Sequence, residues 1–140
     1  MIDKIPESEN EILKVFDYPE YEIRNGHIEE LFLRFNFDKL AILPKNIGIL
    51  KYLRKFGLPE NSLTILPESF EKLKKLRYLD LTGNKISLLE NITNFTQLEK
   101  LYLGFNQITS IPANIENLKF LANLELQNNE ITQNGKHSHY

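Results

Sequence analysis

Apolar residues recur along most of this chain in one spacing, Leu-x-x-Leu-x-Leu-x-x-Asn-x-Leu, with Ile or Phe replacing Leu at some positions. The pattern starts at residues 28, 53, 76, 98 and 121, so successive copies lie 25, 23, 22 and 23 residues apart. The first copy is irregular, because its last apolar position falls at Leu40, two residues late. A recurrence of this length is typical of repeat proteins, in which each copy buries its apolar side only against its neighbours.

Two kinds of element are predicted within each copy. The central Leu-x-Leu alternates like a short strand, and stacking the copies pairs these strands into a parallel sheet. The other half of the copy returns the chain along the outer side, where proline fixes the entry turn and apolar residues three apart favour a short helical or 3-10 segment. This half begins Leu43-Pro44, Leu66-Pro67 and Ile111-Pro112. The third copy has Leu89-Glu90 there and one residue fewer, which predicts a tighter turn.

Each copy also carries one asparagine at the point where the strand ends. The five are Asn36, Asn61, Asn84, Asn106 and Asn129. An amide side chain both donates and accepts, so it can satisfy backbone groups of its own coil and of the adjacent one. We therefore interpret this row as structural, and not as a catalytic or metal-binding row.

Residues 1–27 do not fit the repeat and are expected to form an N-terminal cap of a helix and a hairpin. An acidic helix start follows Pro6, and its apolar face would be Ile12, Leu13, Val15 and Phe16. Asn25-Gly26 favours a two-residue type I′ turn between two strands. The repeats then occupy residues 28–132, and residues 133–140 form a polar tail.

Composition narrows the function classes. Of 140 residues, 41% are hydrophobic and 26% charged, and 17 Lys and Arg against 19 Asp and Glu give a net charge of −2, which argues against a nucleic-acid binder. Without cysteine the chain has no disulfide, thiolate zinc site or cysteine nucleophile. No apolar run is long enough for a membrane span and no secretory signal is recognisable, so we expect a cytoplasmic protein. The sequence shows no phosphate loop, catalytic elbow or metal motif, and we predict no cofactor and no enzymatic activity.

The repeated motif resembles that of the leucine-rich repeat family, over residues 28–132. The Leu-Pro-x-x-Ile-x-x-Leu half looks like the short repeats of intracellular and prokaryotic members. The resemblance implies an α/β fold, a right-handed curved solenoid with a parallel sheet on the concave face and short helical or 3-10 turns on the convex side. It also implies a non-enzymatic module that binds a protein or peptide on the concave face. A second reading, from family members that carry or regulate kinases, phosphatases, GTPases or ubiquitin ligases, is the recognition part of a larger signalling assembly.

The concave face supplies the candidate binding residues, since the outward positions of the strands carry an unusual share of aromatic and charged side chains. The candidates are Phe32, Arg34, Phe35, Lys55, Tyr78, Asp80, Lys100, Tyr102, Phe105 and Glu125. Aromatic residues and arginine dominate binding hot spots. The alternative is structural: Phe35 fills the irregularity of the first copy, Phe105 packs over a neighbouring turn, and Tyr78 and Tyr102 stack as a ladder.

The end of the repeat array offers a third reading. After Ile131 only polar residues follow, and none of them provides an apolar face to cover the last coil, built on Leu121, Leu124 and Leu126. Either the array continues beyond this sequence, or the open flank meets another chain, as in a homodimer, or the flank is only partly exposed and tolerated.

Overall fold

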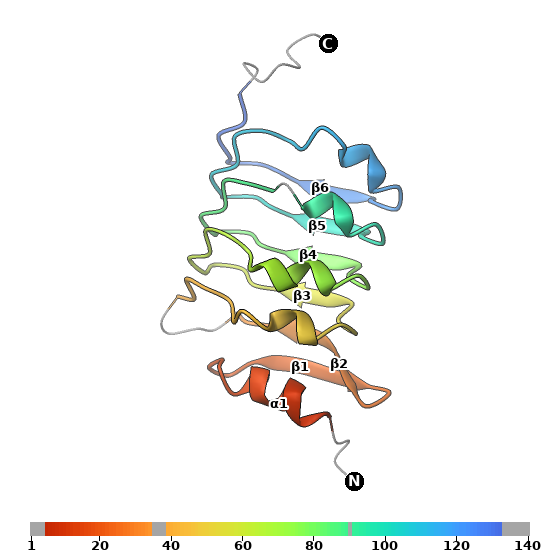
Figure 1. Cartoon of the computed structure of the whole chain (residues 1–140). Coiled ribbons are helices and arrows are strands. Elements are labelled where there is room, and N and C mark those ends of the chain that lie inside the picture. Colours follow the sequence, from red (N-terminus) through yellow and green to blue (C-terminus); the bar gives the residue numbers. More distant parts are fainter. Residues whose placement is uncertain (1–4, 35–38, 90, 133–140) are drawn as a thin grey trace.

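The computed structural model describes residues 5–34, 39–89 and 91–132. These residues form one α-helix, four 3-10 helices and six strands, stacked coil upon coil (Figure 1). In chain order the elements are α1 (Glu7–Leu13), β1 (Glu20–Arg24), β2 (His27–Phe32), η1 (Ile47–Ile49), β3 (Lys55–Gly57), η2 (Glu68–Lys72), β4 (Tyr78–Asp80), η3 (Ile92–Asn94), β5 (Lys100–Tyr102), η4 (Ile115–Asn117) and β6 (Asn123–Glu125).

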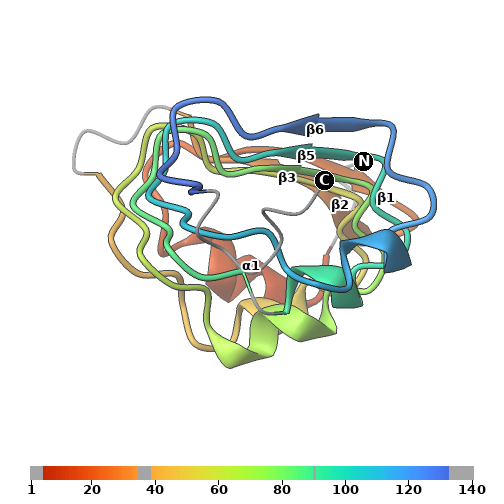
Figure 2. The same ribbon diagram turned by 90° about the horizontal axis from the view of Figure 1, so that it is seen from above.

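All six strands belong to one sheet, in the order in which they occur along the chain. β1 pairs with β2 antiparallel, and every later pair is parallel. Figure 2 shows the strands along one side of the stack and the 3-10 helices along the opposite side. The predicted α/β solenoid, with a parallel sheet and 3-10 return segments, is therefore confirmed.

The core lies between the sheet and the return segments. Its central row is the inward residue of each parallel strand, and Leu31, Phe56, Leu79 and Leu101 in this row are fully buried. On the return side Phe70 stacks on Phe56 and meets Phe95 edge to face, with ring centroids 5.8 and 5.5 Å apart. Burying one such side chain is worth about 1.5–3 kcal/mol, so stacking identical coils provides most of the stability.

The asparagines tie neighbouring coils together. Asn84 accepts a hydrogen bond from the backbone N–H of Leu63 at 3.0 Å and donates to the carbonyls of Leu58 and Leu81 at 2.9 and 3.0 Å. Asn61, Asn106 and Asn129 bridge two coils in the same way. Asn36 lies outside the described residues.

The N-terminal helix and hairpin occupy the first end of the stack. Asn25 and Gly26 have φ values of 53° and 75°, as a type I′ turn requires. The buried Glu9 carboxylate joins the helix to the hairpin, because it lies 2.7 Å from His27 Nδ1 and accepts the N–H of Ile28 at 2.9 Å. One expectation was wrong: α1 ends at Leu13, so Val15 is 60% exposed and does not belong to the buried face.

The outer segments differ in length. The tighter turn expected at Leu89-Glu90 includes residue 90, which lies outside the described residues. η3, in the third copy, has three residues like η1 and η4, whereas η2 in the second copy has five. Pro67 immediately precedes this longer helix, and its φ is −65°. The second copy is therefore the exceptional one.

The last coil is the least covered part of the described chain. Its inward strand residue Leu124 is 39% exposed, and Leu121 and Leu126 are only partly buried. Phe120 and Ile131 are 68% and 39% exposed. None of the helices in the described residues is long and apolar enough to cross a bilayer.

Candidate functional site

Strand register brings the outward residues of the five parallel strands into two rows. One row is Glu30, Lys55, Tyr78, Lys100 and Asn123, and the other is Phe32, Gly57, Asp80, Tyr102 and Glu125. These rows, with Arg34 and Phe105 beside them, form a surface that we call the sheet face. All the candidate residues except Phe35, which lies outside the described residues, therefore share one surface.

A chain of aromatic side chains crosses the sheet face. Phe32 meets Tyr78 edge to face at 6.1 Å between ring centroids, and Tyr78 meets Tyr102 in the same manner at 5.4 Å. The Arg34 guanidinium lies 4.5 Å from the centre of the Phe32 ring. Such contacts fix the rings while leaving part of each exposed, so the chain can stabilise the sheet and also offer a preformed apolar surface.

The Phe32 ring occupies a place that only glycine leaves open. A Cβ atom on Gly57, the residue opposite Phe32 in the neighbouring strand, would lie 2.4 Å from the ring. The ring therefore covers the Gly57 backbone directly, which is why Gly57 is buried although it belongs to an outward row.

Burial also affects the Tyr78 hydroxyl. Desolvation raises the pKa of Tyr78 above its ordinary value, and the nearby Asp80 carboxylate raises it further. Tyr78 is consequently a neutral hydrogen-bonding group at any physiological pH.

Phe105 is held in a conformation that bulky residues avoid. Its φ is 58°, in the left-handed region, and the equivalent positions of the other described coils, Glu60, Gly83 and Asn128, have φ of 56°, 73° and 56°. The turn after each strand therefore demands this geometry, which costs a non-glycine residue about 1–2 kcal/mol. Phe105 is nevertheless 55% exposed. More than half of the Phe105 surface therefore remains open to solvent.

Charges are paired at the N-terminal end of the sheet face and open at the other end. The Glu30 carboxylate, almost buried, lies 3.2 Å from Arg24 and 3.3 Å from Lys55. Lys100 forms no ion pair with any described residue, and Glu125 has only a long contact of 3.4 Å with Gln127. The exposed aromatics Tyr102 and Phe105 thus adjoin charged groups that are available to a ligand.

Within the described part of the chain, three or more His, Cys, Asp or Glu side chains that could hold a metal ion do not come together.

Sequence reasoning missed a second surface, on the return side. Ile42, Ile65 and Leu88 occupy equivalent places in three consecutive coils and are 75%, 68% and 64% exposed. The signal was present: each aliphatic residue directly precedes the Leu-Pro or Leu-Glu step, at a position where the repeat needs no apolar side chain.

Comparison with protein families decides the classification. A "Leucine rich repeat" model matches residues 26–86 and a "Leucine Rich repeats (2 copies)" model matches residues 96–135. The chain belongs to the leucine-rich repeat family. Among proteins with curated annotation, none is similar enough to count as a match.

Bacterial and plant proteins are among the solved structures that are similar to this leucine-rich repeat protein. The Leptospira interrogans protein LIC12759 has a TM-score of 0.67 and 35% identity, over 72% of this chain and 26% of its own. A Listeria monocytogenes internalin, inlF, has a TM-score of 0.60 and 27% identity, over 65% of this chain and 26% of its own. The ectodomain of the Arabidopsis thaliana receptor kinase GASSHO1/SCHENGEN3, solved with CASPARIAN STRIP INTEGRITY FACTOR 2, has a TM-score of 0.61 and 28% identity, over 70% of this chain and 12% of its own.

Proposed function

We propose that this leucine-rich repeat protein is a non-enzymatic interaction module that binds a protein or peptide through its sheet face, the surface expected from the sequence to be concave. The observation that carries the proposal is Phe105, an aromatic ring held at positive φ and left 55% exposed beside Tyr102. The turn requires positive φ in every described coil but does not require an aromatic side chain, and an exposed aromatic residue is typical of a binding hot spot. The leucine-rich repeat fold is a common protein–protein interaction module, which supports the same conclusion. We also propose that the protein is cytoplasmic, as the sequence leads us to expect.

Peptide selection tests the proposal. A phage library of random dodecapeptides is selected on the full chain, and the affinity of the selected peptides is compared with that for the double variant Tyr102→Ala, Phe105→Asn. Asparagine suits positive φ, as Asn128 shows at the equivalent position, so this change removes the ring without straining the turn. We expect affinity to fall at least about tenfold, the effect of losing a hot-spot aromatic.

Phe120→Ala is the matched control, because Phe120 is an aromatic residue that is 68% exposed and belongs to neither row of the sheet face. It should leave the affinity unchanged. If the selected peptides bind the double variant as tightly as the wild type, the sheet face is not the binding surface.

A homodimer through the last coil is the second candidate. Leu124, Ile131 and Phe120 are 39%, 39% and 68% exposed on that coil, and an open strand edge and apolar flank favour association. Light scattering over a hundredfold range of protein concentration tests it: a mass that doubles supports the dimer, and a constant monomer mass contradicts it.

The reading of the chain as the recognition part of a larger signalling enzyme assembly also stays open. A receptor-kinase ectodomain is among its solved neighbours, and the chain spans 12% of that ectodomain and 26% of each bacterial neighbour above.

A further inference from the structure

An apolar stripe runs along the return side over the first three coils. It consists of Ile42, Ile65 and Leu88, each more than 60% exposed. The side chains are neighbours, because Ile42 and Ile65 line one depression and Ile65 and Leu88 line the next. In the fourth coil Ser110 takes the equivalent place and ends the stripe. Large aliphatic residues that are exposed side by side, unlike single scattered ones, mark an interaction surface.

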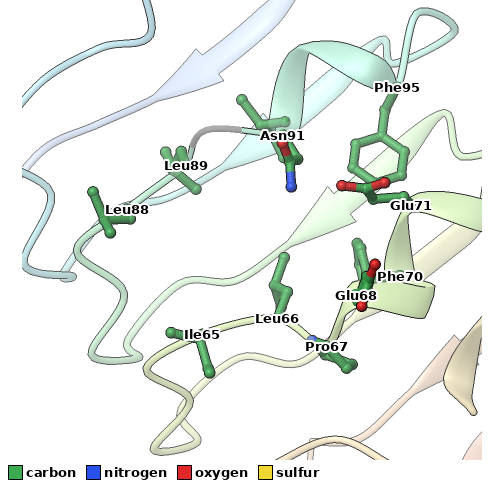
Figure 3. A pocket seen from close by; sticks show the side chains of 11 residues that line it. Ile65, Leu66, Pro67, Glu68, Phe70, Glu71, Leu88, Leu89, Asn91 and Phe95 are labelled. Atoms are coloured by element: carbon green, nitrogen blue, oxygen red, sulfur yellow. The ribbon is translucent and has the colours of Figure 1, made fainter. Parts of the chain in front are cut away.

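The depression between the second and third coils has a volume of about 170 Å³. Phe70 and Phe95, each 2% exposed, form its floor, and Ile65 and Leu88 lie at its edge (Figure 3). Ligand pockets for small molecules have volumes of roughly 300–1,000 Å³. This hollow therefore suits one or two side chains of a larger partner.

The return segments are joined differently on the two sides of η2. η1 and η2 are joined by Ser69, whose hydroxyl accepts the N–H of Gly48 at 3.0 Å and donates to the Lys45 carbonyl at 2.6 Å. No hydrogen bond between the described residues of 65–72 and 88–95 joins η2 to η3. η3 is therefore not tied to η2 as η1 is, and the hollow lies between η2 and η3.

Two carboxylates border this hollow. Glu68 and Glu71 are three residues apart on η2, and side chains at this spacing lie above one another on a 3-10 helix. Figure 3 shows both on the same side of the hollow, across from Ile65 and Leu88. Neither forms an ion pair with a described residue, and no cationic side chain lines this hollow. Lys45 and Lys72 line the neighbouring depression, between Ile42 and Ile65. Two like charges side by side favour a ligand that brings a cation.

We propose that this groove, formed by Ile65, Leu88 and the hollow between them, docks an extended segment of a partner protein in which aliphatic side chains alternate with lysine or arginine. An aliphatic side chain enters the hollow over Phe70 and Phe95, and the adjacent cation pairs with Glu68 and Glu71. The acidic border disfavours phosphate groups, so the geometry points to a protein segment and away from a nucleic acid or an anionic membrane.

The probe is the peptide acetyl-Leu-Arg-Leu-Arg-amide, titrated into the ¹⁵N-labelled full chain while backbone amide shifts are followed by NMR. We expect saturable shifts concentrated in residues 65–71 and 88–95. The affinity derived from them should fall as salt is added. The peptides acetyl-Ser-Arg-Ser-Arg-amide and acetyl-Leu-Glu-Leu-Glu-amide, which lack the apolar group or the cation, should bind much more weakly.

A double variant isolates the charge contribution. Glu68→Gln, Glu71→Gln keeps the side-chain shape and should weaken binding about fivefold, the combined effect of two exposed ion pairs. The matched control is Glu99→Gln, Glu116→Gln, which removes two exposed glutamates elsewhere and should change nothing. Leu88→Ser tests the apolar part and should weaken binding without unfolding the chain, because Leu88 is 64% exposed.

Several results would overturn the proposal. One is the absence of saturable shifts in these segments, and another is equal binding of all three peptides. Concentration-dependent shifts there without peptide would instead assign the groove to a second copy of the chain. The groove is independent of the sheet face, so the Tyr102→Ala, Phe105→Asn variant should bind this peptide normally even where it fails to bind library-selected peptides.

Discussion

Replacing Asn84 by alanine tests how the coils are held together. Asn84 is 6% exposed and bridges the second and third coils. Its loss orphans the Leu63 N–H, which has no other acceptor. The carbonyl groups keep second partners, since Leu58 also accepts from Asn61 and Leu81 from Asn106. One buried unsatisfied donor costs about 1–3 kcal/mol and each lost bond with a retained partner about 0.5 kcal/mol. We therefore expect Asn84→Ala to lower the free energy of unfolding by about 3 kcal/mol.

Asn129→Ala is the internal control. Asn129 makes the equivalent bonds, to the Ile108 N–H at 3.0 Å and the Leu103 carbonyl at 2.8 Å, but it is only partly buried in the last coil. Water can replace those bonds, so we expect a loss of about 1 kcal/mol. Equilibrium urea unfolding followed by circular dichroism gives both values, with tyrosine fluorescence as the second probe of two-state behaviour. Equal losses for the two variants would show that the buried asparagine bridges do not determine coil stability.

Three further changes test other contacts. Gly48→Ala would place a Cβ atom 2.2 Å from the Ser69 carbonyl oxygen, so we expect it to lower the free energy of unfolding, measured in urea, by about 1–3 kcal/mol. Unchanged stability would show that η1 and η2 can move apart without cost. Glu9→Ala should lower the free energy of unfolding by about 2 kcal/mol because the Ile28 N–H loses its acceptor. Glu9→Gln should lower it less because the amide oxygen can accept the same bond, and equal losses would contradict this role of Glu9 as an acceptor. Burial raises the pKa of Tyr78 above the ordinary value of about 10, so the unfolded chain loses this proton first and stability falls as pH rises from about 10 through the folded-state pKa. In an absorbance titration of tyrosinate, Tyr78→Phe should remove the most alkaline step, and an unchanged curve would contradict the assignment.

The sequence pattern predicts the repeat architecture well because the local spacing of apolar residues sets that architecture. The same Leu-x-Leu alternation that defines a copy also defines which side chains point outward, so the two rows of the sheet face follow from the motif. The repeat period alone already determines which residues of neighbouring strands lie opposite each other. The asparagine bridges follow for the same reason, since each amide occupies one place in a recurring turn.

Features that depend on unequal neighbours could not be predicted in this way. Glu9 caps the hairpin through a contact 19 residues away, and no local pattern specifies that partner. Glu30 holds an outward position, yet Arg24 and Lys55 cover it. The hollow beside Phe70 lies between η2 and η3, and it appears only when two coils are placed side by side.

Mapping a library-selected peptide on the ¹⁵N-labelled chain by NMR tests most directly whether recognition occurs on the sheet face. We expect the largest shifts in β4 and β5, at residues 78–80 and 100–102, and at Phe105. Shifts confined to the return side or to β6, with β4 and β5 unaffected, would contradict recognition through the sheet face.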